Sequence, residues 1–173
     1  IFMSSIDLYP VDDCSHDEES HIPVSSTTNP YVFSKMATEN IVRKSSADFL
    51  ILRLGMLLGP YMRPNNLTRV IRGDPGAMTL SRDSEFYITP YEDVADVIRM
   101  ALKDGLTGTL NAMLVPKVSL GALAETFDAK VTFGDFLYSP AIVSNKRIAG
   151  LCPSFTQSPI AAIKAFAENG HDE

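Results

Sequence analysis

Runs of apolar residues alternate with helix-like segments along the chain. Residues Phe49 to Leu54 are apolar except for Arg53, a pattern typical of a strand that is covered on both faces. Ile1 to Met3 is predicted to be a short buried strand that ends at the serine pair Ser4-Ser5. Further short strands are predicted over residues 77–80, 85–88, 109–113 and 130–133.

Helix-start signals indicate where the helices begin. Asn29 and Pro30 suit the cap and the first position of a helix that runs to about Ser46. Thr89 and Pro90 suit the same two positions of another helix, whose apolar residues then recur at helical spacing. Three more helices are predicted over residues 65–72, after Ser119 and after Ser158-Pro159.

The alternation of helices and apolar strands indicates an α/β layered domain. Residues 12–28 are polar and acidic and are predicted to form a loop. The first residue already belongs to a predicted buried strand, whereas chain ends usually lie at the surface, so we expect further residues upstream of Ile1. Near Gly59 the regular strand–helix–strand pattern gives way to shorter elements, which indicates a mild boundary.

The composition narrows the choice of partners and compartment. The chain has 173 residues, of which 45% are hydrophobic and 21% charged, and this composition is ordinary for a globular protein. The net charge of −6 argues against nucleic acid or an anionic membrane as partner. Cys14 and Cys152 are far apart and predict neither a disulfide nor a metal site. A reducing, cytoplasmic compartment is expected, and no apolar run approaches the ~20 residues of a membrane span.

Tyr31 and Lys35 are the first candidates for chemistry. They stand at positions i and i+4 of the helix predicted after Asn29, so they share one helix face. An ammonium beside a phenol favours the phenolate, and such a phenol is a plausible general base near neutral pH. Taken alone, the pair fits an ordinary helix surface better than a reaction centre.

Five stretches of the chain carry motifs in a recognisable order: residues 1–9, 31–35, 52–60, 91–98 and 108–111. The first ends a strand in Ser5 and has Tyr9 four residues later, and the second reads Tyr-x-x-x-Lys. Glu39 and the Gly-Pro pair at 59–60 fit the same pattern. Together they resemble the later part of the extended short-chain dehydrogenase/reductases, the NAD-dependent epimerase/dehydratase family.

The resemblance implies a fold. We expect a Rossmann-like doubly wound parallel sheet, here partial, whose dinucleotide-binding part covers residues 1–59. Residues 60–173 are expected to form mainly a small α/β substrate-binding region, from which some elements return to the sheet. The family's glycine-rich turn, which holds the dinucleotide pyrophosphate, does not occur in this sequence.

The resemblance also implies roles at the reaction centre. Tyr31 is expected to be the general acid or base and Lys35 its partner, which also binds the nicotinamide ribose. Ser5 is expected to hydrogen-bond the reacting oxygen; an ordinary strand-end hydroxyl is the other interpretation. A hydride would pass between the substrate carbon and the nicotinamide of NAD or NADP.

Further contacts follow from the same resemblance. Besides Tyr31 and Lys35, the cofactor is expected to lie against Ser4, Gly55 and Met56. Asp7 and Arg82 are candidates for contact with the substrate, although each is also compatible with a solvated surface position. The expected partners are a small molecule, most simply a nucleotide sugar, and a second copy of the chain, which would pair through the Tyr-Lys helix.

The implied function is an NAD(P)-dependent oxidoreductase or epimerase that acts on a nucleotide sugar or a similar hydroxyl compound. Dehydratases of the family have two acids after the catalytic Thr, and Ile6 replaces the first of them, so dehydration is disfavoured. A non-catalytic dinucleotide-sensing or scaffold relative stays open, because Met56 replaces a frequent asparagine and no arginine accompanies Phe86.

Other polar residues receive simpler interpretations. His16, His21 and His171 stand in polar surroundings and are expected to face solvent. A basic cluster is either a solvated helix face or an anion-binding surface; it consists of Arg63, Arg69 and Arg72.

Overall fold

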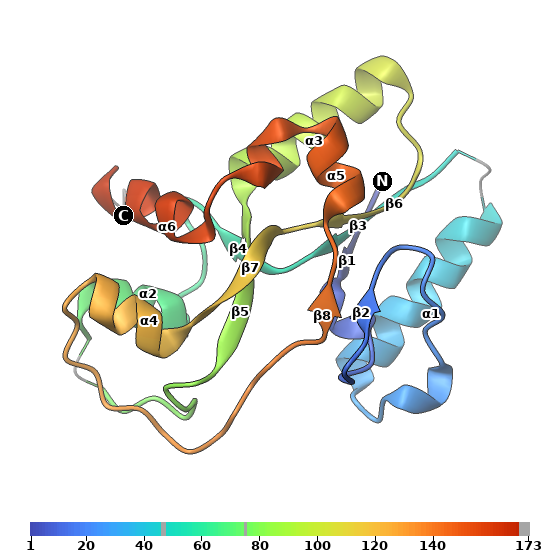
Figure 1. Cartoon of the computed structure of the whole chain (residues 1–173). Coiled ribbons are helices and arrows are strands. Elements are labelled where there is room, and N and C mark those ends of the chain that lie inside the picture. The colour runs from blue at the N-terminus through green and yellow to red at the C-terminus, as the bar shows by residue number, and fades with distance from the viewer. Residues whose placement is uncertain (46–47, 75, 170–173) are drawn as a thin grey trace.

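A parallel three-stranded sheet, in the order β1-β3-β6, forms one half of the fold (Figure 1). In this computed structural model, which describes residues 1–45, 48–74 and 76–169, its strands are β1 (Phe2–Ser5), β3 (Leu50–Leu54) and β6 (Gly108–Ala112). All five residues of β3 are buried, as expected for a strand between two others with both faces covered. The predicted α/β class and parallel sheet are confirmed.

A second sheet continues directly from the first. It contains β4 (Met56–Leu58), β5 (Glu85–Pro90) and β7 (Leu114–Ser119), with β4 parallel and β7 antiparallel to β5. Only Gly55 separates β3 from β4. A Cβ atom at Gly55 would lie 2.5 Å from the carbonyl oxygen of Tyr87, so the close approach of the two backbones requires glycine here.

Six α-helices are described around these sheets, together with the two-residue parallel pair β2 (Ser15–His16) and β8 (Ile142–Val143). Helices α2 and α4 lie side by side, and α1 lies against β1 (Figure 1). The helices are α1 (Pro30–Ser45), α2 (Asn66–Arg72), α3 (Tyr91–Asp104), α4 (Leu120–Thr126), α5 (Lys146–Leu151) and α6 (Pro159–Glu168). The 3₁₀ turns are η1 (Ile6–Leu8), η2 (Val24–Ser26) and η3 (Pro153–Thr156).

The main core lies between the two larger sheets and helices α2 to α6, and Leu52, Ile88 and Leu120 are fully buried in it. Helix α1 packs separately, since Val32 and Met36 form a small cluster with Leu8 of η1. This contact sets α1 against the turn that follows β1. The packing therefore places the start of α1 beside the end of β1.

Most predicted helix starts are confirmed. Asn29 accepts a hydrogen bond from the Tyr31 amide at 2.9 Å and α1 begins at Pro30; Ser46, the predicted end, lies outside the described residues. Ser119 caps α4 through the Ala122 amide, and α2 and α6 begin as expected. The cap assigned to Thr89 is wrong, because its hydroxyl accepts from the Gly55 amide and donates to the Ala112 carbonyl, joining the two sheets; Pro90 is the N-cap of α3 instead.

The strands predicted over residues 77–80 and 130–133 are wrong. These segments do lie together, with the Met78 amide donating to the Thr132 carbonyl at 2.9 Å and an isolated bridge between Leu80 and Phe136. Their hydrogen bonds do not repeat regularly enough to form a ladder. Strand β7 was missed because Pro116 and Lys117 interrupt its apolar pattern.

One of the histidine interpretations is also wrong. His16 is buried, its ring stacks on Tyr9 with centroids 5.4 Å apart, and its Nε2 lies 2.9 Å from Asp12 Oδ1. In the sequence, acidic residues follow His16, and nothing there indicates that the Tyr9 ring covers it. His21 is exposed as expected, and His171 lies outside the described residues.

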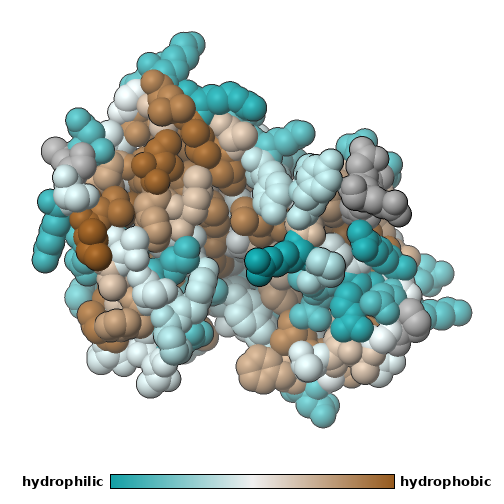
Figure 2. Space-filling view, turned by 180° about the vertical axis from the view of Figure 1, so that it is seen from behind, coloured by the Kyte–Doolittle hydropathy of each residue, from teal (hydrophilic) through white to brown (hydrophobic). Residues whose placement is uncertain are grey.

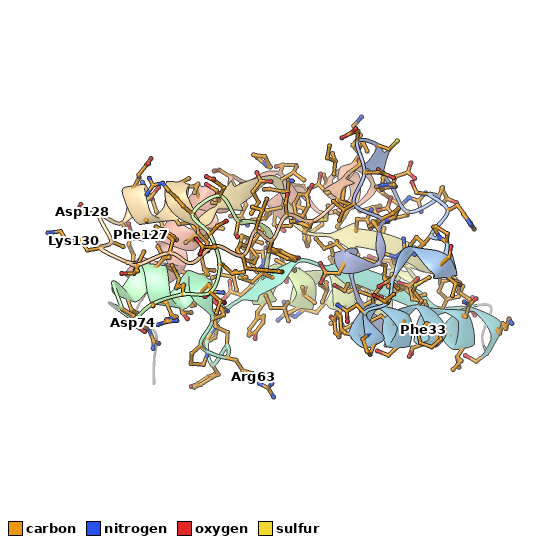
Figure 3. The ribbon with its side chains drawn as sticks, turned by 90° about the horizontal axis from the view of Figure 1, so that it is seen from below. Phe33, Arg63, Asp74, Phe127, Asp128 and Lys130 are labelled. Carbon is orange, nitrogen blue, oxygen red and sulfur yellow. The ribbon has the colours of Figure 1, made fainter. Side chains whose placement is uncertain are left out.

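The surface carries both polar and apolar areas. From behind, hydrophobic side chains gather in the upper left of the face (Figure 2). Arg63 is exposed and points away from the body of the molecule (Figure 3), while Arg69 pairs with Asp74 at 3.2 Å. The basic cluster predicted from the sequence therefore does not converge on one point. No described helix is long and apolar enough to cross a bilayer.

Candidate active site

The end of β1 and the start of α1 meet at a cavity of about 340 Å³, within the range of small-molecule sites. Strand β1 ends at Ser5, whose hydroxyl caps η1 by accepting from the Asp7 amide at 3.2 Å. Parallel strands β1 and β3 both end here, and ligands of open α/β sheets bind beyond the carboxyl ends of such strands. The fold therefore presents this edge for binding.

Residues from distant parts of the sequence line the cavity. Seven of the sequence-predicted site residues are among them: Ser4, Ser5, Asp7, Tyr31, Lys35, Gly55 and Met56. Apolar side chains and aromatic rings complete most of the wall: Met3, Ile6, Leu54, Leu57, Phe86 and Tyr87. The cavity is thus mostly apolar with a few convergent polar groups, which is the usual composition of a ligand site.

Lys35 is anchored at the strand that it faces. Its Nζ donates to the Met3 carbonyl at 2.8 Å and lies 5.7 Å from the centroid of the Tyr31 ring. The Tyr31 side chain, one turn earlier on α1, remains half-exposed at the cavity. The two side chains thus lie on one helix face, as the spacing predicted.

Tyr138, from a distant segment of the chain, contributes a second polar group to the cavity lining. Tyr138 donates from its hydroxyl to Asp7 Oδ1 at 2.7 Å, and Ser5 donates to Asp7 Oδ2 at 3.2 Å. The Tyr138 ring stacks on Phe86 with centroids 5.0 Å apart. Burial raises the pKa of Tyr138, and the Asp7 carboxylate raises it further, so the phenol stays protonated at neutral pH.

Sequence reasoning missed Tyr138, which stands 131 positions after Asp7. It lies in a segment without regular secondary structure, between the strand wrongly predicted at 130–133 and β8. A lone tyrosine in such a segment gives no local signal. Only the return of this segment to the cavity reveals it.

Arg82 is not brought to this cavity. It pairs with Glu125 and lies over the Phe133 ring, 5.8 Å from its centroid, next to the backbone of Gly121. Of the lining residues in the described part of the chain, Lys35 is the one cation and Asp7 the one acid. The described side chains also contain no cluster of three or more His, Cys, Asp or Glu that suits a metal ion.

A buried polar network lies behind the site and fixes α1 to the sheet. Arg53 on β3 donates to Glu39 on α1 through Nε at 3.0 Å and Nη2 at 2.8 Å, and through Nη1 to the Tyr9 hydroxyl at 2.7 Å. Although burial would raise the pKa of Glu39, its hydrogen bonds and charge interaction with Arg53 outweigh this and lower it. The network holds the helix that carries Tyr31 and Lys35.

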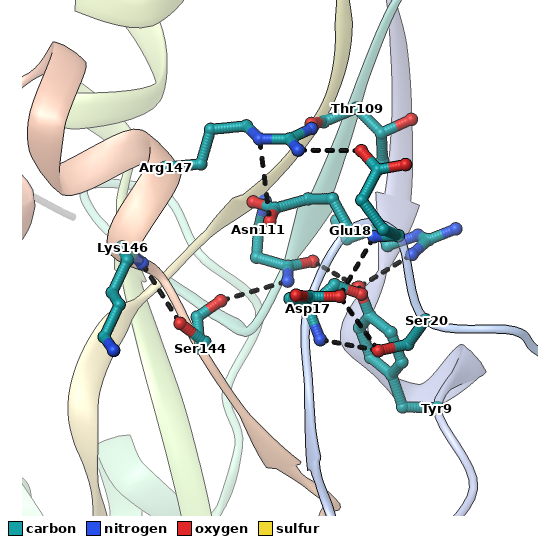
Figure 4. A network of polar contacts seen from close by, with 11 residues as sticks. Tyr9, Asp17, Glu18, Ser20, Thr109, Asn111, Ser144, Lys146 and Arg147 are labelled. Atoms are coloured by element: carbon teal, nitrogen blue, oxygen red, sulfur yellow. Dashed lines mark hydrogen bonds and ion pairs between the residues drawn. The ribbon is translucent and has the colours of Figure 1, made fainter.

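The same network extends to the loop before α1 (Figure 4). The Tyr9 hydroxyl lies 2.8 Å from both the Asp17 carbonyl and Asn111 Oδ1. The Glu18 carboxylate accepts from the backbone amide of Asn111 at 2.8 Å. Arg147 pairs with Glu19 at 2.7 Å. The acidic loop, predicted from its polarity, is therefore attached to β6 and α5 by specific contacts.

A comparison with the sequence profiles of known families shows to which family the chain belongs. The sequence profile of the NAD dependent epimerase/dehydratase family matches residues 1–111. The chain therefore belongs to this family. A comparison with curated protein sequences gave no significant match.

Solved structures with the same fold include proteins in complex with NAD, NADP or a nucleotide sugar. MoeE5 in complex with UDP-glucuronic acid and NAD is 18% identical, with a TM-score of 0.75 over 96% of this chain and 62% of that one. UDP-glucose 4-epimerase from Thermus thermophilus with NAD is 19% identical, with a TM-score of 0.72 over 96% and 62%. The dTDP-4-dehydrorhamnose reductase of Bacillus anthracis with NADP is 18% identical, with a TM-score of 0.75 over 98% and 65%.

These likenesses establish the Rossmann-type fold. The chain spans about 60% of the length of the structures that it matches, such as MoeE5, of which it covers 62%.

Proposed function

We propose that the complete protein, including any residues that flank this chain, is an NAD(P)-dependent oxidoreductase or epimerase that acts on a nucleotide sugar. The observation that carries the proposal is the meeting of Ser5, Tyr31 and Lys35 at one cavity beyond the ends of β1 and β3. Family membership and the nucleotide-sugar enzymes that share the fold support it further.

In the proposed mechanism Tyr31, Lys35 and Ser5 act on the same substrate oxygen in different ways. Tyr31 exchanges a proton with the substrate oxygen at the carbon that is oxidised or reduced. Lys35, held by the Met3 carbonyl, stabilises the negative charge that develops there. The Ser5 hydroxyl, which donates to Asp7 in this structure, turns to donate to the same oxygen. NAD or NADP, when bound, accepts or supplies the hydride.

The residues around the cavity fit the nicotinamide end of such a cofactor. The Lys35 ammonium suits the ribose hydroxyls, and Met56 offers an apolar contact for a flat ring. Gly55 brings backbone close to the cavity wall without a side chain in the way. Together with Ser4, these residues are the proposed cofactor contacts.

Replacement of Tyr31 by Phe tests the proposal. Turnover of UDP-glucose with NAD by the complete protein is expected to fall by about 10²–10⁴-fold, because the proton-transfer group is lost, while circular dichroism stays unchanged. Tyr61→Phe is the matched control, since Tyr61 is exposed and lies outside the cavity lining. Equal turnover of the Tyr31→Phe variant and the wild type would reject the assignment.

A second function is favoured by the absence of arginine from the described lining of the cavity. A non-catalytic relative that senses dinucleotides would bind NAD but convert no nucleotide sugar. Steady formation of NADH or of an epimeric product would exclude this alternative.

The proposal also includes a homodimer and a division of the chain into residues 1–59 and 60–173. Exposed apolar side chains on α1, Phe33 at 54% and Ile41 at 66%, support pairing through this helix. Met36, by contrast, is buried against Leu8 and Val32 and is unavailable for pairing. Sedimentation of the complete protein as a monomer would contradict the dimer.

A further inference from the structure

The Asp7–Tyr138 contact is a part of the cavity that the proposed roles of Ser5, Tyr31 and Lys35 do not explain. It joins η1 to the segment before β8 and forms a wall shared by two cavities, of about 340 Å³ and 460 Å³. Asp7 takes part in none of the ion pairs that the described residues form. Its carboxylate therefore faces the cavity without a cation of its own.

The directions of the hydrogen bonds determine what this wall offers to a ligand. The Tyr138 and Ser5 hydroxyls both direct their protons at the Asp7 carboxylate. The Tyr138 oxygen therefore keeps lone pairs for a ligand, whereas the Ser5 oxygen already accepts from the Asp7 backbone amide. A carboxylate has room for further donors besides these two hydroxyls, so the wall accepts hydrogen bonds and carries one negative charge.

The cavity has one positive charge to set against this. Lys35 is the one cation of the described lining, and its ammonium is already hydrogen-bonded to the Met3 carbonyl on β1. A ligand with hydroxyl groups can donate to the acceptor wall. A ligand with a carboxylate in the same place meets a like charge, and this repulsion is strong where the charges are partly buried.

We infer that Asp7 makes this site selective for the neutral, hydroxyl-bearing form of the sugar and against the corresponding uronic acid. The inference rests on the proposed function for the nucleotide part of the ligand. UDP-glucose and UDP-glucuronic acid are suitable probes because they differ in this one oxidised carbon, and MoeE5 has been solved with each.

The experiment compares binding of the two probes to the complete protein with NAD at about pH 7.5 by calorimetric titration. The wild type is expected to bind UDP-glucose at least about tenfold more tightly than UDP-glucuronic acid. In Asp7→Asn, which keeps the shape and an acceptor for Tyr138, this ratio is expected to fall toward one. Tyr138→Phe keeps the charge and is expected to keep the preference for the neutral sugar.

Asp13→Asn serves as the matched control, because it removes one negative charge from an exposed residue outside the cavity lining, and it is expected to leave the ratio unchanged. Equal affinity of the wild type for both probes, or an unchanged ratio in a folded Asp7→Asn variant, would overturn the inference and leave the proposed function standing. If neither probe binds, the proposed function and the inference fail together. Should Asp7→Asn fail to fold, the wild-type ratio and the Tyr138→Phe ratio still decide.

Discussion

Two polar clusters in this molecule use the same kinds of side chain, a carboxylate and a tyrosine from distant segments. In the interior, Glu39 accepts from Arg53, which also donates to Tyr9. At the cavity, Asp7 accepts from Tyr138 and Ser5. The interior carboxylate has an arginine beside it, whereas the one at the cavity is not ion-paired within the described residues.

The difference separates a structural role from a ligand-binding one. A buried charge needs a partner that satisfies it, and Glu39 and Arg53, which are 5% and 4% exposed, do this for each other. Asp7 is only partly buried, so a ligand or water can complete its hydrogen bonds. The first cluster should respond to mutation mainly in stability, and the second mainly in ligand binding.

The largest expected effect is in the interior. Arg53→Met leaves the buried Glu39 carboxylate without its main partner and should lower the free energy of unfolding by about 3–5 kcal/mol. The double variant Glu39→Leu/Arg53→Met should recover most of this loss, because an apolar pair of similar volume is often as stable as a buried ion pair. Urea denaturation measures both; equal losses in the single and double variants would contradict the assignment.

A smaller effect distinguishes the interior tyrosine from the one at the cavity. Tyr9→Phe leaves Arg53 and Asn111 with an unsatisfied group and should cost about 1–3 kcal/mol of unfolding free energy. Tyr31→Phe, at a half-exposed residue, should change it by less than about 0.5 kcal/mol. Thermal denaturation of the two variants side by side tests this, and the reverse ranking would break the distinction.

The smallest effect is confined to acid pH. The pKa of Glu39 is lowered below its ordinary value of 4.5, chiefly by Arg53 acting against burial. Its contribution to stability is therefore complete above pH 4.5 and is lost as the pH falls through the lowered pKa. Between neutral pH and acid, Glu39→Gln should lose less unfolding free energy than the wild type. Parallel acid-titration curves for the two proteins would show that Glu39 carries no such contribution.

Local patterns predicted much of the scaffold. Asn29 and Ser119 mark helix starts that the structure confirms, because capping depends on neighbours a few residues apart. The start of α6 follows instead from Pro159 at its first position. Thr89 does not follow its local pattern. Its hydroxyl could have capped α3 but bridges Gly55 and Ala112 in the structure, and that competition between distant partners has no local signature.

Short-range periodicity and ordered motifs were enough to predict the α/β class, the family and the Tyr31–Lys35 spacing. Long-range packing brings Tyr138 to Asp7, buries His16 against Tyr9 and holds Arg82 away from the cavity. These contacts join segments far apart in the chain, and their energies depend on burial and hydrogen-bond direction, which arise only when those segments pack together.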